Sequence, residues 1–359
     1  MTPGPTRIPP RVLLAGHRIL HHRTPEFSSA LAELIEGARP LFGTSSADLL
    51  PIHATGRAAM EGAIVNFFLP GDTVVAACNG KFGEMWAGFA ERFGLKVVRV
   101  AQDWDRSVDP DEVGAALAAN PESGAVLVVH SDTSTGVLNP VAEIAAVARG
   151  HSALVLVDGI SSVGGTSFAF DEWGLDFAVV SSQKCLMCSP GVSLAVVGDR
   201  AWDAAERGGM PRSYLDFASI RRTLTGIRPE TPGTTPVLLV LQLLEAVRMI
   251  HEEGMDSVFG RHQALADRVR ARATGMGYTL QGPGILDRSP ALTSLRVPEG
   301  KDPEAIRARV RDAGIQIAGG LGAYKPRCIR IGHMGDIRME DVERTMDVLE
   351  HATNAIPRA

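Results

Sequence analysis

The chain has 359 residues, which is long enough for two domains and a sizeable buried core. Hydrophobic residues make up 45% of the chain and charged residues 21%, a globular composition and not a disordered one. Its 36 Lys and Arg residues against 41 Asp and Glu residues give a net charge of -5, without a basic block that could follow a nucleic-acid backbone. We therefore expect no nucleic-acid partner.

The apolar segments are too short to cross a membrane. The most apolar run, residues 236–247, contains Gln242 and Glu245 and is well short of the roughly 20 residues that a spanning helix needs. The N-terminus carries several prolines where a signal peptide would have an unbroken apolar core. Four cysteines are too few for a disulfide scaffold. These features predict a cytoplasmic protein with reduced thiols and no membrane partner.

Strands and helices are predicted to alternate in the first two thirds of the chain. A helix is predicted over residues 25–38, where Thr24 can cap the first turn and the apolar residues form one stripe. After it, apolar and β-branched runs alternate with helical patterns. Such near-continuous apolar strands are typical of a parallel sheet covered on both faces, so we expect an α/β fold with a mainly parallel sheet. The predicted strands are residues 73–77, 96–100, 125–129, 153–157, 177–180 and 193–197.

The pattern changes after residue 250. An apolar helix over residues 236–253 is predicted to end at Gly254, a residue type common just after a helix. The helices and strands beyond it predict a smaller α+β domain, so we place a large domain at residues 15–250 and a small C-terminal domain at residues 251–359. The elements predicted in the small domain are helices 262–274, 303–313 and 339–353 and strands 292–297 and 328–331.

Two chemically useful side chains follow neighbouring predicted strands. Asp158 follows strand 153–157, and Lys184 follows strand 177–180. Because parallel strands end at one edge of a sheet, a carboxylate and an amine are expected there together. This pair suits pyridoxal phosphate, which a lysine holds covalently and whose ring nitrogen a carboxylate keeps protonated. Taken singly, Asp158 is better interpreted as a helix cap and Lys184 as a solvated lysine, because both residue types are common at strand ends.

A longer set of motifs carries a family resemblance. Residues 158–165 (DGISSVGG), followed by Ser182-Gln183-Lys184 and Pro190-Gly191, resemble the class V, fold-type I aminotransferases, specifically the alanine/serine–glyoxylate (or pyruvate) group. Further matches occur in order along the chain, namely PGPT, HRTPEF, NGKFG, DTSTG and RIGHMG. The resemblance therefore spans essentially the whole chain. It implies the fold of type I pyridoxal-phosphate enzymes, pyridoxal 5'-phosphate as the cofactor, and a homodimer with active sites at the subunit interface.

The resemblance also implies how the cofactor is held. Lys184 would bind it covalently and Asp158 would hold the ring nitrogen. Phe82 and Ile160 would cover the two faces of the ring, and the Thr133 hydroxyl would reach the ring oxygen. The phosphate ligands that the resemblance implies are Thr55, Gly56, Gln183 and, from the neighbouring subunit, Thr234. Arg57 is a further candidate for the phosphate, as a guanidinium clamp that the family does not share.

Two further positions are implied to bind substrate. Arg330, in an apolar strand, would hold the substrate α-carboxylate by a two-pronged pair. Without the resemblance, Arg330 reads as an arginine on the solvent face of an edge strand. Gly4 lies in an N-terminal segment, residues 1–14, that would close over the active site. The sequence departs from many relatives at Arg57, where they carry a small residue or histidine, and in the loop of residues 231–234.

The implied reaction is transamination between alanine or serine and glyoxylate or pyruvate, with Lys184 as the general base. A specialised class V aminotransferase acting on pyridoxamine, ureidoglycine or a biosynthetic intermediate remains an alternative because of the two departures. A cysteine desulfurase or lyase is disfavoured, since Cys328 lies in a predicted strand and not in a mobile loop. A nicotinamide dehydrogenase is disfavoured because no GxGxxG follows a predicted strand. We expect no metal, since Cys185 and Cys188 form a lone CxxC without a second ligand pair.

Overall fold

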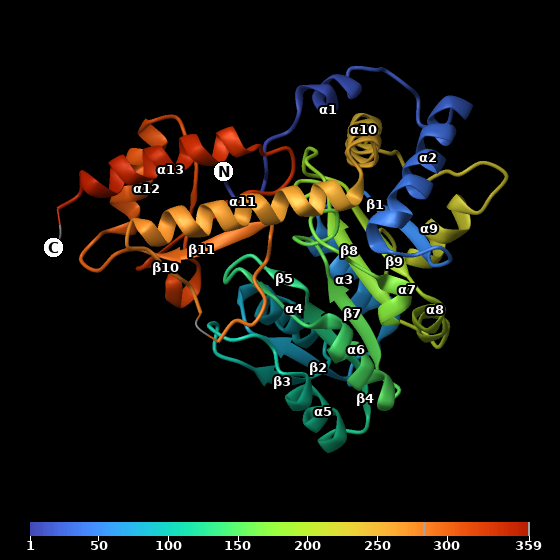
Figure 1. The fold of residues 1–359 in the computed structure, drawn as a ribbon. Helices are drawn as coiled ribbons and strands as arrows, with labels where there is room; N and C mark the ends of the chain where they lie inside the picture. Colours follow the sequence, from blue (N-terminus) through green and yellow to red (C-terminus); the bar gives the residue numbers. More distant parts are fainter. Residues whose placement is uncertain (283, 358–359) are drawn as a thin grey trace.

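The computed structural model describes residues 1–282 and 284–357 and is built around two sheets (Figure 1). The larger sheet has seven strands, of which six run in one direction, while β9, second from the edge, runs antiparallel to both of its neighbours β1 and β8. The expected α/β fold with a mainly parallel sheet is therefore confirmed. In spatial order the strands are β1 (Asp48–Ile52), β9 (Ser193–Val197), β8 (Phe177–Ser181), β7 (Leu154–Asp158), β4 (Ser123–Val129), β2 (Thr73–Cys78) and β3 (Lys96–Ala101).

The antiparallel edge of this sheet differs from the sequence-based expectation. β9 runs antiparallel to β8 because residues 182–192 fold straight back along it, whereas a parallel neighbour would need a long crossover. β1 was not predicted. Its sequence, DLLPI, carries Pro51, which is tolerated because β1 is the edge strand.

Helices cover both faces of the seven-stranded sheet. Strand side chains alternate between the two faces, so Val74 belongs to the apolar cluster on one face, which includes Met60 of α3, while Val75 belongs to the cluster on the other face, which includes Leu31 of α2. The expected cap is present, since the Thr24 side chain accepts a hydrogen bond from Phe27 N. The helices of this part are α1 (Pro10–Ala15), α2 (Pro25–Phe42), α3 (Gly56–Phe67), α4 (Lys81–Arg92), α5 (Pro110–Ala119), α6 (Val141–Gly150), α7 (Phe170–Trp173), α8 (Asp199–Glu206), α9 (Phe217–Leu224) and α10 (Val237–Glu253).

The C-terminal elements build a second layer around an antiparallel sheet of four strands, in the order β10-β11-β13-β12. This sheet and its helices share an apolar core that includes Leu265, Leu295 and Ile329. The long helix breaks at Gly254, and the next helix begins at Met255, seven residues before its predicted start at residue 262. The C-terminal elements are α11 (Met255–Gly275), β10 (Thr279–Leu280), β11 (Leu292–Arg296), α12 (Pro303–Asp312), β12 (Ala318–Gly319), a short 3-10 helix (Gly322–Tyr324), β13 (Cys328–Gly332) and α13 (Met339–Asn354). A small separate hairpin, β5 (Ser131–Asp132) and β6 (Val137–Leu138), follows β4 in the first part of the chain.

The N-terminal segment joins the two layers. It starts beside α11 and α13 and crosses to α1 on the side of the larger sheet (Figure 1). Gly332 N, at the end of β13, donates to Met1 O at 2.9 Å, and Thr6 N donates to Gln183 O at 3.0 Å. Residues 1–6 therefore contact both the four-stranded sheet and the turn that follows β8.

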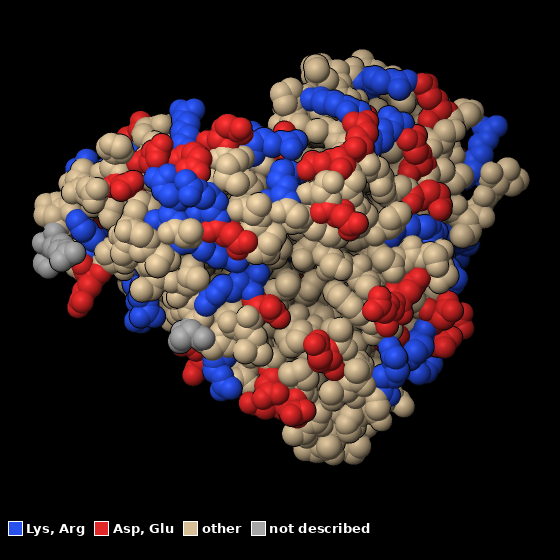
Figure 2. Space-filling view, in the orientation of Figure 1, with Lys and Arg blue, Asp and Glu red and all other residues tan. Residues whose placement is uncertain are grey.

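The surface carries mixed charge. Acidic and basic side chains are interspersed over the face drawn in Figure 2, as the small net charge of -5 leads one to expect. Among the described residues, no helix has the length and apolar character needed to cross a membrane.

Candidate active site

Lys184 lies in the turn after β8, and its Nζ donates to Pro3 O at 2.6 Å. Burial lowers the pKa of the Lys184 amine to about 8, against the opposing attraction of the Asp158 charge. A lysine with this pKa is partly neutral near physiological pH. Its nitrogen is then available as a nucleophile or as a proton acceptor.

Asp158 is the last residue of β7, which lies next to β8 in the sheet. Its Oδ1 accepts a hydrogen bond from Ile160 N at 2.8 Å, and within the described chain Oδ2 has no hydrogen-bond partner. Burial raises the pKa of Asp158 to about 7 although this backbone bond and the Lys184 charge oppose the rise. A cation bound next to the free oxygen Oδ2 would therefore stabilise the ionised form of Asp158.

The N-terminus of α3 meets the same turn. Gly56 N donates to Ser181 Oγ at 3.0 Å, and Ser181 Oγ donates to Gln183 Oε1 at 2.6 Å. A side chain at Gly56 would lie 2.3 Å from Ile160 Cδ1, so any larger residue here would displace the Ile160 side chain. The Thr55 side chain makes no capping bond to α3. A hydroxyl that makes no capping bond, together with the partial positive charge at a helix N-terminus, suits a phosphate.

Arg57, the second residue of α3, is exposed and lies over an aromatic ring. Its guanidinium carbon is 5.2 Å from the ring centroid of Phe89 on α4. In this position Arg57 makes a cation–π contact and no ion pair with the described residues.

Phe82 lies at the start of α4 and is held there by a residue that sequence reasoning missed. Its backbone N donates to Asp132 Oδ2 at 3.0 Å, and Asp132 Oδ1 also accepts from Ser134 N at 2.8 Å. Asp132 is completely buried, and burial raises the pKa of its carboxyl although these hydrogen bonds oppose the rise. Asp132 lies 50 residues after Phe82, the residue that it caps at the start of α4, so no local sequence pattern reveals this contact.

Arg330 enters the site from the four-stranded sheet. It is 8% exposed and lies in β13, between β11 and β12, so its interpretation as a solvent-facing arginine on an edge strand is wrong. Its Nη1 donates to Thr133 O at 2.7 Å and its Nε donates to Gly319 O at 2.8 Å. In the described part of the chain no carboxylate lies within 4.0 Å of the guanidinium, and burial lowers the pKa of Arg330 to about 10. A buried guanidinium without a counter-charge matches an anionic ligand.

Gly4, in the N-terminal segment, lies directly against the Lys184 side chain. It has a φ of 112°, and a side chain there would lie 2.4 Å from Lys184 Cδ. Together with Pro3 it forms a roof over the amine; we call residues 1–6 the roof segment below. The structure thus brings Gly4, Lys184 and Gln183 together.

Thr234 is not brought to this place by its own chain. It is exposed and lines a separate cavity of about 230 Å³ that His53 and Tyr214 also line. The structure leaves its predicted contact, with the cofactor of a neighbouring subunit, as a prediction.

The cysteines are buried and unpaired. Burial raises the pKa of Cys185 and of Cys188 to about 12, and that of Cys328 in β13 to about 11. Thiols in this state are poor nucleophiles. Across residues 1–282 and 284–357, no three His, Cys, Asp or Glu side chains are grouped as metal ligands.

The arrangement fits pyridoxal phosphate. The free oxygen of Asp158 suits a protonated ring nitrogen, the Gly56 cradle at the N-terminus of α3 suits a phosphate, and Lys184 supplies the amine. Fold and site together define a pyridoxal-phosphate enzyme of fold type I. A family model described as class-V aminotransferase matches residues 11–344, so the chain belongs to the class V aminotransferases, and the resemblance seen in the sequence is confirmed.

Curated relatives cover nearly the whole chain. A Synechococcus protein named as the small subunit of a soluble hydrogenase is 37% identical over 355 residues, 98% of this chain and 91% of that protein. The L-aspartate–glyoxylate aminotransferase of Paracoccus denitrificans is 36% identical, covering 93% of this chain and 86% of that protein. The serine–glyoxylate aminotransferase of Methylorubrum extorquens is 35% identical with the same coverage of 93% and 86%.

Solved structures agree in fold. The alanine–glyoxylate aminotransferase from Nostoc has a TM-score of 0.94 at 31% identity, covering 98% of this chain and 94% of that one. The pyridoxamine–pyruvate aminotransferase from Mesorhizobium loti has a TM-score of 0.92 at 29% identity, covering 99% and 91%.

Proposed function

We propose that this aminotransferase moves an amino group from a small amino acid, alanine or serine, to a small 2-oxo acid, glyoxylate or pyruvate. The observation that carries the proposal is that Asp158 and Arg330 both lie close enough to Lys184 for their charges to act on its amine. The glyoxylate aminotransferases among its relatives support it. The name of the Synechococcus protein describes another reaction.

Each residue has a role that follows from its surroundings. When bound, pyridoxal phosphate supplies an electron-accepting ring and a carbon that reacts with amines. Arg330 holds the substrate carboxylate through the side of its guanidinium that faces no protein carboxylate. Lys184 Nζ takes the proton from the substrate Cα, helped by its lowered pKa. Asp158 keeps the ring nitrogen protonated, and the roof segment excludes water.

The test combines spectroscopy with a substrate panel. Purified protein is expected to be yellow, and borohydride reduction followed by peptide mapping is expected to place the cofactor on Lys184. Wild type and Lys184→Ala are then assayed with alanine, serine, aspartate and pyridoxamine against glyoxylate and pyruvate. We expect turnover with alanine or serine in wild type and none in Lys184→Ala. A protein that stays colourless and inactive with added cofactor, or that is labelled at another lysine, would overturn the proposal.

A second candidate is a specialised transamination, with pyridoxamine or ureidoglycine as the donor. It is favoured by Arg57, because many relatives carry a small residue or histidine at position 57, whereas the Arg57 guanidinium here lies over the ring of Phe89. It is also favoured by the likeness to the pyridoxamine–pyruvate enzyme. The same panel decides for pyridoxamine, which has no carboxylate for Arg330, and ureidoglycine, which has one, is added to it as a further donor. A wild-type preference for pyridoxamine that survives Arg330→Ala would select this candidate.

We also propose a homodimer in which Thr234 completes the partner's site. Large apolar side chains are exposed at the Thr234 cavity, on α1 and α10, and in the loops that follow α1 and α9, and burying them against a second copy would stabilise the pair. These side chains are Leu13, Leu14, Ile19, Tyr214, Ile227 and Leu238.

Mixing two defective variants tests this arrangement. A dimer of Lys184→Ala with Thr234→Val has one site with both wild-type residues only if Thr234 crosses the interface. We expect Thr234→Val to weaken cofactor affinity and the mixed dimer to regain activity at limiting cofactor. A fully active monomer by sedimentation, or the absence of any gain on mixing, would remove Thr234 from the site.

The four unpaired, buried cysteines support a cytoplasmic location. Cell fractionation followed by immunoblotting tests this location. Recovery with a membrane or secreted fraction would refute it.

A further inference from the structure

Gly335 lies at a crowded junction beside the active site. It belongs to residues 333–338, which connect β13 to α13. A side chain at Gly335 would lie 3.1 Å from Met187 Cβ and 3.2 Å from Thr6 Cγ2. Met187 closes the turn that holds Lys184, since its N donates to Lys184 O at 2.9 Å. Gly335 is therefore wedged between the Lys184 turn and the roof segment.

Two consecutive residues of α11 hold both polar groups of Gly335. Gly335 N donates to His262 Nε2 at 3.1 Å, and Arg261 Nη1 donates to Gly335 O at 2.8 Å. His262 Nδ1 lies 2.9 Å from Gly165 O, which can only accept, so in the neutral ring the proton is on Nδ1 and Nε2 is the acceptor, although Nε2 also lies 3.2 Å from Gly335 O. His262 is completely buried, and burial lowers the pKa of its ring, which keeps the ring neutral.

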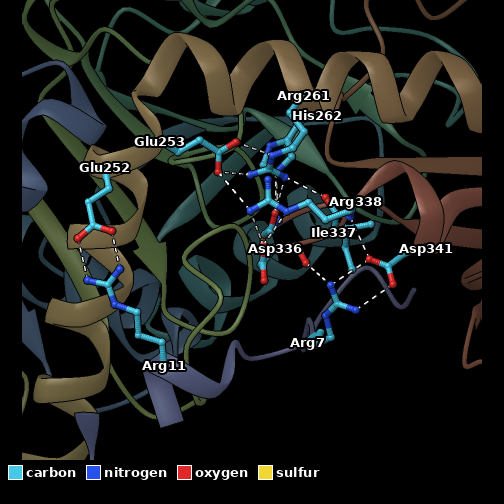
Figure 3. A network of polar contacts seen from close by, with 11 residues as sticks. Arg7, Arg11, Glu252, Glu253, Arg261, His262, Asp336, Ile337, Arg338 and Asp341 are labelled. Carbon is cyan, nitrogen blue, oxygen red and sulfur yellow. Dashed lines mark hydrogen bonds and ion pairs between the residues drawn. The ribbon is translucent and has the colours of Figure 1, made fainter. Parts of the chain in front are cut away.

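The α11 anchor is itself braced by α10. Arg261 forms a two-pronged pair with Glu253, the last residue of α10, at 2.6 Å and 2.9 Å, and also donates to Ile337 O at 3.1 Å. Figure 3 shows this network, with Arg7 of the N-terminal segment paired to Asp341 next to it. The junction of α10 and α11 thus holds residues 333–338 through Arg261, which Glu253 braces, and through His262.

The connection in turn holds the roof segment. Thr6 Oγ1 donates to Met334 O at 3.0 Å, while Thr6 N donates to Gln183 O at 3.0 Å. Pro3 and Gly4, only a few residues before Thr6, contact the Lys184 side chain. A continuous chain of contacts therefore runs from His262 through Gly335 and Thr6 to the roof.

We propose that His262 is a positioning residue that, through Gly335, holds the roof segment over Lys184 and so sets the affinity for the amino-acid substrate. This inference rests on the proposed function, because it assigns the roof to substrate binding. His262 touches neither Lys184 nor Arg330 in the contacts above, so it acts only through the connection. Its bond to Gly335, and not its bond to Gly165, carries the effect.

Two substitutions separate the bonds of His262. In His262→Gln the side-chain oxygen lies near the position of Nε2 and can accept from Gly335 N–H, whereas the donor to Gly165 is lost. In His262→Asn the side-chain nitrogen lies near Nδ1 and can donate to Gly165 O, whereas the acceptor for Gly335 is lost. Tyr278→Phe is the control, because it removes a buried hydrogen bond to Thr353, at 2.6 Å, elsewhere on the C-terminal side.

The experiment measures hydrogen exchange and kinetics on the full-length protein. We expect His262→Asn to speed amide exchange in peptides covering residues 1–8 and 332–338, with and without bound cofactor. It should raise KM for the amino donor about tenfold and change kcat by less than about threefold. His262→Gln should stay within about threefold of wild type in both, and Tyr278→Phe should only lower the unfolding temperature.

The outcomes are distinct from those that test the proposed function. Exchange in residues 1–8 is measured without any turnover, so it decides the roof contact even if the substrate is another. Equal exchange in wild type and His262→Asn would overturn the proposal. Equal KM values for His262→Asn and His262→Gln would also overturn it, since they would show that losing either bond has the same consequence.

Discussion

Replacing Asp158 by Asn is expected to stabilise the cofactor-free protein and to abolish most turnover. Asp158 is 4% exposed, and the one side-chain hydrogen bond that it makes with the described residues comes from Ile160 N, which an Asn side-chain oxygen can accept equally well. The substitution therefore keeps the shape and the bond while it removes a charge from a poorly solvated place.

The magnitude follows from the pKa of this carboxyl. Burial raises the pKa of Asp158 from 3.8 to about 7. As the pH rises through this interval, the unfolded chain has already lost the proton that the folded chain keeps, so the contribution of Asp158 to the free energy of unfolding falls. Above pH 7 the deficit is complete. It amounts to at most about 4 kcal/mol, at about 1.36 kcal/mol for each pH unit.

Urea unfolding of cofactor-free wild type and Asp158→Asn, followed by tryptophan fluorescence between about pH 5 and about pH 8, measures this difference. The advantage of the variant should grow with pH and level off above neutrality. Added pyridoxal phosphate should stabilise wild type more than the variant, because a protonated ring nitrogen compensates only the carboxylate. A wild type at least as stable as the variant at high pH without cofactor would refute the reasoning.

Substitutions at three further positions probe other contacts of the site. Arg330→Lys should lower kcat/KM for alanine or serine, and Arg330→Ala should lower it further, with a loss of transition-state stabilisation of about 2–5 kcal/mol in Arg330→Ala and no change in cofactor affinity. Equal kcat/KM for Arg330→Ala and wild type would place the carboxylate anchor elsewhere. Gly4→Ala should raise KM while Gly208→Ala should not, since both glycines have a φ of 112° but only Gly4 lies against Lys184; similar KM values would mean that the roof does not bound the substrate site. Asp132→Asn should weaken cofactor binding by about 1–3 kcal/mol, read from the cofactor's absorbance, because an amide cannot accept every bond that fixes Phe82; unchanged affinity would show that Phe82 does not need this cap.

The sequence predicted those parts of the molecule that depend on local pattern. Apolar strands ending in Asp158 and in the turn to Lys184 follow from periodicity and from the rule that parallel strands end at one edge, and the structure has both strands side by side. The break at Gly254 follows from a residue type that ends helices. The edge strand β1 was missed because Asp48 and Pro51 remove the usual apolar signal.

Other contacts depend on which distant segments meet, and one sequence does not encode them visibly. Asp132 caps α4 across the fold, and Gly335 donates to His262 of α11, which lies 73 residues before it in the sequence. The burial of Arg330 depends on β12, a strand of two residues, Ala318–Gly319, that no periodicity predicts. These positions are specified by tertiary packing, so a pattern search along the chain passes over them.

The three charged groups at the centre of the site share one electrostatic condition. Burial raises the pKa of Asp158 to about 7 and lowers those of Lys184 and Arg330 to about 8 and about 10, so each group is pushed toward its neutral form. A protonated ring nitrogen would compensate Asp158, and a substrate carboxylate would compensate Arg330, while Lys184 works best when neutral. The site therefore holds charges at a cost to the stability of the free protein, and cofactor and substrate recover that cost when they bind. This is why the Asp158 and Arg330 substitutions should change the stability of the empty site with opposite sign. Asp158→Asn is expected to stabilise it, whereas Arg330→Ala also breaks the bonds to Gly319 in the neighbouring strand β12 and to Thr133 in the turn between β5 and β6.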